Sequence, residues 1–185
     1  MVFDLFTLVE GFWFFLPAYG ANGLAPLVKY LPARHRMDGG RQWRGKPLLG
    51  EGKSWEGFAL GTLVAILVSL IQLAAFPSLP WSLSEQQGVT LHIAPMGPLL
   101  GLLLGLGAMG ADALKSIVKR QLRLARGSPL PLVDQDDFIL GSFLLAGLLV
   151  PAALSWLVLF LVITPAVHFA TCFLGFRLGI KKEPW

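Results

Sequence analysis

The sequence has few charged residues and a single cysteine, and both shortages restrict the kind of protein that it can encode. Only 14% of its 185 residues are charged and 55% are hydrophobic, whereas a soluble domain usually carries about 25% charged residues. So little charge excludes a solvated, disordered chain and leaves too few polar residues to cover a soluble globule. The lone Cys172 excludes a disulfide framework. The composition therefore indicates a single integral membrane domain.

Basic residues are absent from three long stretches, residues 1–28, 54–114 and 127–176. All 15 Lys and Arg residues fall in three clusters, at residues 29–53, 115–126 and 177–182. Cytoplasmic loops of membrane proteins collect Lys and Arg, so we expect all three clusters to face the cytoplasm. An even number of membrane crossings must then separate successive clusters.

The apolar stretches have room for five crossings, because a core of ~30 Å needs about 20 helical residues at ~1.5 Å each. We predict an all-α integral membrane protein with five transmembrane helices, with the N-terminus outside and the C-terminus inside. The expected spans are about 2–28, 57–76, 95–115, 138–152 and 154–176. The remaining segments are two cytoplasmic ones, about 29–56 and 112–137, and an outer loop, about 77–94.

Polar residues begin where the apolar run 95–111 ends. Asp112, Lys115, Ser116 and Lys119 follow at helical spacing, so they share one face of a helix. A carboxylate at this depth is costly unless another group pairs with it. The alternative is a surface ion pair within a basic collar that attracts anionic lipids.

Three carboxylates follow two prolines at the end of the second cytoplasmic segment. They belong to Asp134, Asp136 and Asp137. Carboxylates at positions i and i+3 of a helix N-terminus suit Mg²⁺, which prefers oxygen ligands and shares them with substrate phosphates. A third carboxylate, such as that of Asp112, would let two ions be held. Helix capping by Asp134, with Asp137 one turn later, is the alternative.

Glycine-rich sequences occur in two places and indicate different structures. Residues 50–54, Gly-Glu-Gly-Lys-Ser, resemble the end of a phosphate-binding loop, whose backbone N–H groups can cradle phosphate. Pro47 stands where a Walker A loop needs glycine, and an ordinary flexible loop is the alternative. Residues 105–110 match G-x-G-x-x-G, but no strand precedes them. That segment, like Gly101-x-x-x-Gly105, indicates close packing of membrane helices.

Carboxylates for a metal, clustered cations and a glycine–lysine loop at one membrane face are typical of phosphoryl or nucleotidyl transfer to a lipid. A lipid phosphate needs no general base as a nucleophile, because its second pKa is about 6. The three histidines, His35, His92 and His168, lack metal-ligand spacing. The basic residues indicate membrane orientation and not nucleic-acid binding.

The polar motif also resembles that of the membrane cytidylyltransferases that make CDP-activated lipids. The matching residues are Gly110-Ala111-Asp112, Ser116, Lys119-Arg120, Gly127, Pro131, Asp134-Gln135, Asp137 and Phe138. The bacterial branch has His-Gly-Gly where this chain has Pro-Leu-Val-Asp-Gln. The archaeal branch, the CDP-archaeol synthases, has a Leu-Gly-Asp-Gly-Lys-Thr-Trp-x-Gly loop similar to residues 49–57, in which Glu51 and Ser54 replace Asp and Thr. Ala21-Asn22 and residues 181–185 also resemble that branch.

The resemblance implies an enzyme of the plasma membrane, with a cytoplasmic active site, that transfers CMP from CTP to an unsaturated archaeal ether-lipid phosphate. The acceptor would be 2,3-bis-geranylgeranyl-glycerol 1-phosphate, and the products CDP-archaeol and pyrophosphate. Mg²⁺ would be held by Asp112, Asp134 and Asp137, and phosphates would be bound by Lys119 and Arg120. The nucleotide and its phosphates would contact Gly50, Gly52, Lys53, Ser54 and Ser116. The lipid tails would lie in a groove between helices that opens to the bilayer.

Two alternatives stay open at this point. The first is a CDP-diacylglycerol synthase that acts on the ester lipid phosphatidate, because the chemistry would be the same. The second is a transporter or scaffold without catalytic activity whose basic loops bind anionic headgroups. The sequence does not define an oligomeric state.

Overall fold

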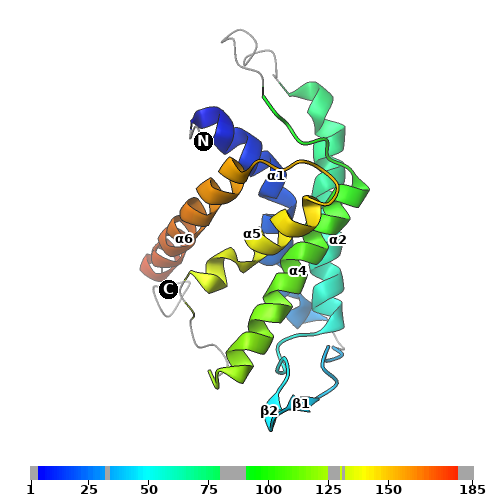
Figure 1. Ribbon diagram of the computed structural model, residues 1–185, viewed down its shortest axis with the longest axis vertical. Coiled ribbons are helices and arrows are strands. Elements are labelled where there is room, and N and C mark those ends of the chain that lie inside the picture. Colours follow the sequence, from blue (N-terminus) through cyan, green and yellow to red (C-terminus); the bar gives the residue numbers. More distant parts are fainter. Residues whose placement is uncertain (1–3, 32–33, 80–90, 125–129, 131, 179–185) are drawn as a thin grey trace.

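The computed structural model describes residues 4–31, 34–79, 91–124, 130 and 132–178, and these form an almost entirely helical fold (Figure 1). The helices are α1 (Leu5–Leu24), α2 (Trp55–Ala75), α4 (Pro98–Gln121), α5 (Val133–Ala146) and α6 (Leu154–Arg177). Two 3₁₀ turns follow α1 and α2, at Ala25–Tyr30 and Phe76–Ser78. Strands β1 (Gln42–Trp43) and β2 (Lys46–Pro47) form an antiparallel hairpin. The predicted all-α class is confirmed.

Three helical segments are long and apolar enough to cross a membrane: Trp55–Ser78, Pro98–Gln121 and Leu154–Leu174. They correspond to the predicted spans 57–76, 95–115 and 154–176. Helix α5 has 14 residues, which is about 21 Å and shorter than a hydrocarbon core of about 30 Å. Helix α1 has 20 residues but carries a buried Glu10. The count of five crossings and their orientation stay predictions.

The helix expected at residues 138–152 begins and ends earlier than its apolar sequence suggests. It covers Val133–Ala146, so Asp134 and Asp136 lie in its first turn, where carboxylates interact favourably with the helix dipole. Asp134 is therefore not the N-cap, a position that Leu132 occupies. Because α4 also continues to Gln121, much of the predicted cytoplasmic segment 112–137 is helical.

Helix α4 lies at the centre and packs closely against α2 and α5 through glycines. A Cβ atom on Gly105 would lie 2.9 Å from the Cβ of Ala65 in α2, and one on Gly107 would lie 2.3 Å from the carbonyl oxygen of Gly141 in α5. Such distances leave no room for a side chain at either glycine. The interpretation as a packing motif is confirmed for Gly101, Gly105 and Gly107, but not for Gly110, where a Cβ would meet no atom within 4 Å.

Helices α1 and α6 pack on this core through aromatic side chains. The ring centroids of Phe14 and Trp156 are 5.3 Å apart, as are those of Phe15 and Phe160. The buried carboxylate of Glu10 accepts hydrogen bonds from the Trp156 indole at 2.9 Å and from the backbone N–H of His92 at 2.6 Å. Because these bonds join α1, α6 and the segment before α4, they fix the end of the molecule away from the hairpin.

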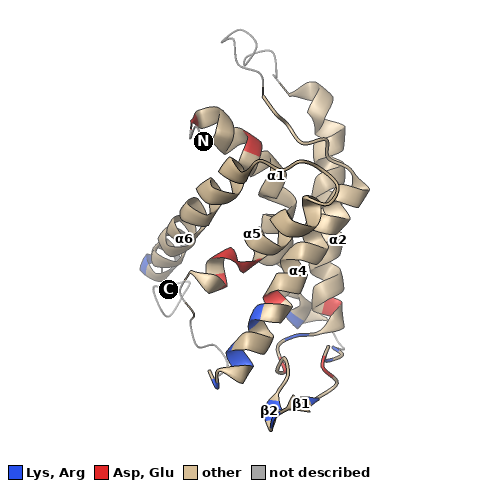
Figure 2. Cartoon of the chain, viewed as in Figure 1, with Lys and Arg blue, Asp and Glu red and all other residues tan. Residues whose placement is uncertain are grey.

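The described basic residues gather at one end of the molecule (Figure 2). Most of them lie around the hairpin and in the last turns of α4, whereas the end of α6 lies at about mid-height of the view and the first turn of α1 lies towards the other end (Figure 1). The expectation that all three basic clusters share one membrane face stays a prediction. Several sequence features lie outside the described residues: residues 80–90 of the outer loop, Arg126, Gly127, Pro131 and residues 181–185.

Candidate active site

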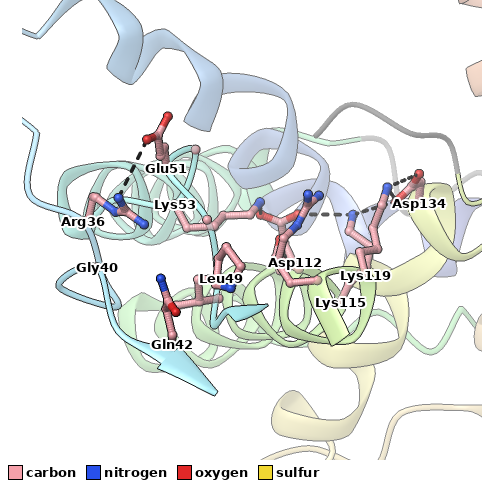
Figure 3. Close-up of a pocket in the computed structure, with 15 residues that line it drawn as sticks. Arg36, Gly40, Gln42, Leu49, Glu51, Lys53, Asp112, Lys115, Lys119 and Asp134 are labelled. Atoms are coloured by element: carbon pink, nitrogen blue, oxygen red, sulfur yellow. Dashed lines mark hydrogen bonds and ion pairs between the residues drawn. The ribbon is translucent and has the colours of Figure 1, made fainter. Parts of the chain in front are cut away.

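A polar cavity of about 570 Å³ lies where the loop around the hairpin meets the basic end of α4 and the start of α5 (Figure 3). Five basic and three acidic side chains line it: Arg36, Lys53, Lys115, Lys119, Arg120, Glu51, Asp112 and Asp134. The excess of positive charge suits a polyanion. Residues 49–52, which include two glycines, line the same cavity.

The loop keeps its shape through the buried carboxylate of Asp38. That carboxylate accepts hydrogen bonds from the backbone N–H groups of Gly40, Leu49 and Gly50, at 2.9, 3.1 and 3.2 Å, and from the Arg36 Nε at 3.2 Å. Gly50 has a φ of 90°, which a residue with a Cβ rarely adopts. One buried side chain therefore holds both ends of the hairpin and orients the glycine segment that faces the cavity.

These hydrogen bonds keep Asp38 ionised. Burial alone would raise the pKa of its carboxyl group, but the three backbone N–H groups and Arg36 outweigh burial and lower the pKa from 3.8 to about 2. Because the folded pKa is below the ordinary value, the carboxylate stabilises the fold fully above about pH 4, and this contribution disappears as the pH falls towards 2.

We expect Asp38→Asn to weaken binding of the nucleotide that the sequence resemblance implies more than it slows the implied reaction. The amide of asparagine places an N–H donor against backbone donors, and an unsatisfied buried donor costs about 1–3 kcal/mol. The KM for the nucleotide should rise about tenfold at pH 7, while kcat changes by less than about threefold, because Asp38 does not line the cavity. Steady-state kinetics of the two proteins test this, and an unchanged KM would contradict the assigned role.

A chain of ion pairs connects the loop, α4 and α5. The Lys53 Nζ pairs with Asp112, and the Lys115 Nζ lies 3.2 Å from Asp112, 3.6 Å from Asp134 and 2.9 Å from Asp137. The Lys119 Nζ donates to both carboxylate oxygens of Asp134, at 2.9 and 3.0 Å. Three carboxylates and three ammonium groups thus form one partly buried cluster.

The carboxyl groups at the start of α5 differ in their environments. Burial raises the pKa of Asp134, but the Leu130 N–H, Lys119 and Lys115 outweigh it, so that the net pKa is lowered. Burial, together with the neighbouring charge of Asp137, raises the pKa of Asp136 to about 6. The surroundings of Asp134 therefore favour its ionised form. Those of Asp136 are more apolar and disfavour its ionised form.

Those surroundings are an apolar groove of about 690 Å³ between α4 and α5. Its walls include Leu114, Val118, Leu140 and Leu144, which are all exposed. The groove is therefore open at the surface of the described helices and is lined mostly by apolar side chains. The groove and the polar cavity have one described lining residue in common, Lys115.

The structure places most of the predicted site residues together. Eight of them line the polar cavity: Gly50, Gly52, Lys53, Asp112, Ser116, Lys119, Arg120 and Asp134. Asp137 faces the groove and reaches the others through Lys115. Ser54 does not line the polar cavity, because its hydroxyl caps α2 by accepting the Gly57 N–H, and it borders a smaller cavity of about 270 Å³.

Two residues at the site, Arg36 and Asp38, were not selected from the sequence, and Lys115 was placed on the helix face of Asp112 but given no role at the site. Arg36 and Asp38 lie in the loop before the hairpin, where the Asp-Gly-Gly sequence is a signal for an Asx turn. That signal could have identified Asp38 as a turn residue, although not its contacts with residues 49 and 50. Lys115 shares the helix face of Asp112, but only the folded α5 shows that it contacts three carboxylates.

The residues at the site fit the magnesium that the sequence resemblance implies. Within the described residues, no group of three or more His, Cys, Asp or Glu side chains is arranged as a ready metal site. The carboxylates of Asp112, Asp134 and Asp137 nevertheless converge on one cation, the ammonium of Lys115. Carboxylate oxygens are the ligands that Mg²⁺ prefers, so the donor chemistry is suitable.

Comparisons with known proteins agree with this site. Residues 2–185 match the family model described as CarS-like, CDP-archaeol synthase. The chain is 37% identical over 185 residues to the CDP-archaeol synthase of Halobacterium salinarum, with 97% of each chain covered. It is 34% identical over 179 residues to that of Pyrococcus horikoshii, covering 96% of this chain and 97% of the relative.

A solved structure supports the same assignment. It is described as an intramembrane enzyme for archaeal membrane lipid biosynthesis, and it matches this fold with a TM-score of 0.61 at 28% identity, covering 88% of this chain and 92% of that one. The resemblance seen in the polar motifs is thus confirmed over nearly the whole sequence. The chain belongs to the CDP-archaeol synthase family and is an enzyme of that family.

Proposed function

We propose that this enzyme transfers CMP from CTP to 2,3-bis-geranylgeranyl-glycerol 1-phosphate in a reaction that requires Mg²⁺. The observation that carries the proposal is the meeting of a cationic cavity and an apolar groove at Lys115. A water-soluble polyphosphate and a lipid could therefore approach one point from opposite sides. The basic residues that line the cavity would put it on the cytoplasmic face, where CTP is available.

The polar cavity would bind the triphosphate. Backbone N–H groups of the glycine segment would contact phosphate oxygens, and Lys119 and Arg120 from α4 line the same space. The Arg120 side chain comes within 3.7 Å of the position that a Cβ would take on Gly50. Cations on one wall and N–H groups on the other would offset the negative charge that develops during transfer.

The groove would hold the isoprenoid tails with the lipid phosphate at its polar end. A phosphate oxygen of the lipid then attacks the α-phosphorus of CTP, forming a new P–O bond while the bond to the bridging oxygen of the β-phosphate breaks. Pyrophosphate leaves with the electron pair of that bond. A phosphate monoester is mostly dianionic at neutral pH, since its second pKa is about 6, so no general base is required.

Asp112, Asp134 and Asp137 would hold the magnesium, which supplies positive charge to the phosphate oxygens. In the ligand-free arrangement their charges are balanced by Lys53, Lys115 and Lys119. The same three carboxylates keep the lysines at the cavity wall. Loss of one carboxylate would therefore affect both the binding of the cation and the positions of these side chains.

The ester lipid phosphatidate is the remaining alternative acceptor. The groove walls are mostly leucine, valine and glycine, and these residues do not distinguish an ether from an ester linkage. Membership of the CDP-archaeol synthase family favours the archaeal ether lipid. The same membership sets aside a transporter or scaffold without catalytic activity.

Release of pyrophosphate by the detergent-purified protein tests the proposal. The reaction contains CTP, MgCl₂ and geranylgeranyl ether glycerophosphate, and a matched reaction contains dioleoyl phosphatidate. We expect release that requires both the metal and the lipid, with the ether lipid preferred. Faster release with phosphatidate would indicate the diacylglycerol pathway, and no release from folded protein with either lipid would overturn the proposal.

We expect Gly110→Phe to block the lipid without affecting the nucleotide. Gly110 lines the groove, and a Cβ at this position would meet no atom within 4 Å, so the phenyl ring would fill the space of a lipid tail. The KM for the lipid phosphate should rise about tenfold or more, as expected when a pocket is obstructed. The KM for CTP in the same variant is the control. An unchanged lipid KM would exclude the groove as the acceptor site.

A further inference from the structure

Lys115 occupies a position that no other described residue shares. Its ammonium group lies within 3.6 Å of carboxylate oxygens from Asp112, Asp134 and Asp137, and its side chain is 13% exposed. It lines both the polar cavity and the apolar groove. Lys53 and Lys119 contact the same cluster but line no part of the groove.

We propose that Lys115 is a displaceable internal cation. In the free enzyme it neutralises the three carboxylates; when a metal–nucleotide complex binds, its ammonium moves to the groove and binds the phosphate of the incoming lipid. Substrate binding would then be ordered, with the nucleotide first. This inference rests on the proposed function, because it assumes that a divalent cation and a lipid phosphate are bound at these two places.

The first argument is competition for the same oxygen atoms. Mg²⁺ binds carboxylate oxygens at about 2.0–2.1 Å, and the oxygens nearest to the Lys115 Nζ are those of Asp137 and Asp112, at 2.9 and 3.2 Å. An ammonium group and a divalent ion would repel each other strongly at such separations. The cluster has three carboxylates and three ammonium groups, so a bound divalent cation adds an excess of two positive charges and favours the departure of an ammonium group.

The second argument is that, among the lysines of the cluster, Lys115 is the one whose side chain can move into the apolar groove. The apolar groove begins beside it, and lysine has a flexible stem of four carbons. The buried Asp136 lines the groove near this point, and its Oδ1 has no hydrogen-bond partner in the described part of the chain. An ammonium in apolar surroundings needs an anion, which the phosphate of a lipid supplies.

The third argument concerns the side of the protein from which the lipid substrate enters. A lipid that enters from the bilayer meets the groove before the cavity, and Lys115 is the first described basic side chain at the groove. While Lys115 is engaged by carboxylates, the groove offers no free cation among its described lining residues. Low affinity for the lipid phosphate before nucleotide binding follows directly from this arrangement.

Two measurements that do not depend on turnover test the inference. The first is the thermal unfolding midpoint of the detergent-purified protein as a function of MgCl₂. The second is the binding of geranylgeranyl ether glycerophosphate, with and without Mg²⁺ and a CTP analogue that has a methylene bridge between the α- and β-phosphates. Both are made on the wild-type protein, on Lys115→Met, and on Lys46→Met as a matched control, because Lys46 lines neither the cavity nor the groove and its Nζ donates to the Gln121 carbonyl oxygen.

For the wild-type protein, we expect the metal and the analogue together to raise the affinity for the lipid phosphate about tenfold, as expected for one charge-assisted contact. Lys115→Met should have a lower midpoint without metal and a larger rise with MgCl₂ than the wild-type protein, because no ammonium competes for the carboxylates. Its affinity for the lipid phosphate should be low and insensitive to the analogue. Lys46→Met should keep the enhancement by the analogue.

Two results would overturn the inference. The first is a rise in the lipid-phosphate affinity of Lys115→Met with the analogue that is as large as the rise in the wild-type protein. The second is a smaller effect of MgCl₂ on the unfolding midpoint of Lys115→Met than on the wild-type midpoint. If Lys115→Met does not fold, Lys115→Gln keeps a polar group among the carboxylates and is measured in the same way. A wild-type protein that binds neither the metal nor the lipid phosphate would contradict the proposed function itself. The two failures are therefore distinguishable.

Discussion

Replacement of Asp134 by asparagine will lower kcat at least about a hundredfold, the loss typical of removing one preorganised electrostatic group from an active site. The substitution keeps the shape of the side chain but removes the charge that Lys119 contacts at 2.9 Å and Lys115 at 3.6 Å. It also weakens the acceptor for the Leu130 N–H, which lies 2.7 Å from Asp134. Pyrophosphate release at saturating CTP, metal and lipid measures the effect.

The matched control for this loss is Asp4→Asn. Asp4 caps α1 by accepting the Thr7 N–H at 2.8 Å, and α1 begins at the end of the molecule away from the cavity. Asparagine and aspartate are about equally good N-caps, so kcat should stay within about twofold. An Asp134→Asn protein that retains more than about a third of wild-type activity would refute the assigned role of this carboxylate.

Gly107→Val will destabilise the fold by about 3 kcal/mol or more, the upper part of the range for overpacking. A Cβ on Gly107 would lie 2.3 Å from the carbonyl oxygen of Gly141, and one on Gly141 would lie 2.2 Å from the carbonyl oxygen of Gly107. Only backbone atoms could move to relieve the contact. Helices α4 and α5 would separate, and the start of α5 would no longer lie beside Lys115.

A thermal unfolding midpoint in detergent tests this second prediction. A loss of that size corresponds to a fall of roughly 6 °C or more for a chain of this length. Gly110→Ala on the same helix is the control, because a Cβ there meets no atom within 4 Å and alanine is favoured over glycine in a helix by about 1 kcal/mol. If both variants unfold at the wild-type temperature, the backbone contact between α4 and α5 is not as close as described.

The pattern of apolar and charged residues predicted the helical class and the approximate positions of the helices, while the number and orientation of the crossings stay predictions. Helices α1, α2 and α5 lie within segments without Lys or Arg, and most of the described basic residues lie towards one end, although α4 carries basic residues in its last turns. Helical spacing correctly placed Asp112, Ser116 and Lys119 on one face, since all three line the same cavity. These features depend on local sequence and on whether a segment is surrounded by lipid or by water. The amino-acid composition of a segment indicates both.

Features that depend on contacts between distant segments could not be predicted in the same way. The start of α5 at Val133 depends on the dipole of its first turn and on the lysines of α4 that hold Asp134. Ser54 looked like a phosphate ligand because glycines and a lysine precede it, but its hydroxyl serves as the N-cap of α2. The contacts of Lys115 could not be predicted from local sequence, because they include carboxylates that lie up to 22 residues further along the chain.

Transfer of the α-phosphate of CTP to the lipid is the central claim, and labelled CTP tests it most directly. The wild-type protein is incubated with MgCl₂, geranylgeranyl ether glycerophosphate and CTP labelled with ³²P at either the α- or the γ-position, and the lipid is then extracted. The proposed reaction puts the α-label in the lipid and the γ-label in pyrophosphate. A γ-label in the lipid would instead show a kinase-type transfer, and absence of both labels from the lipid would contradict cytidylyl transfer by this enzyme.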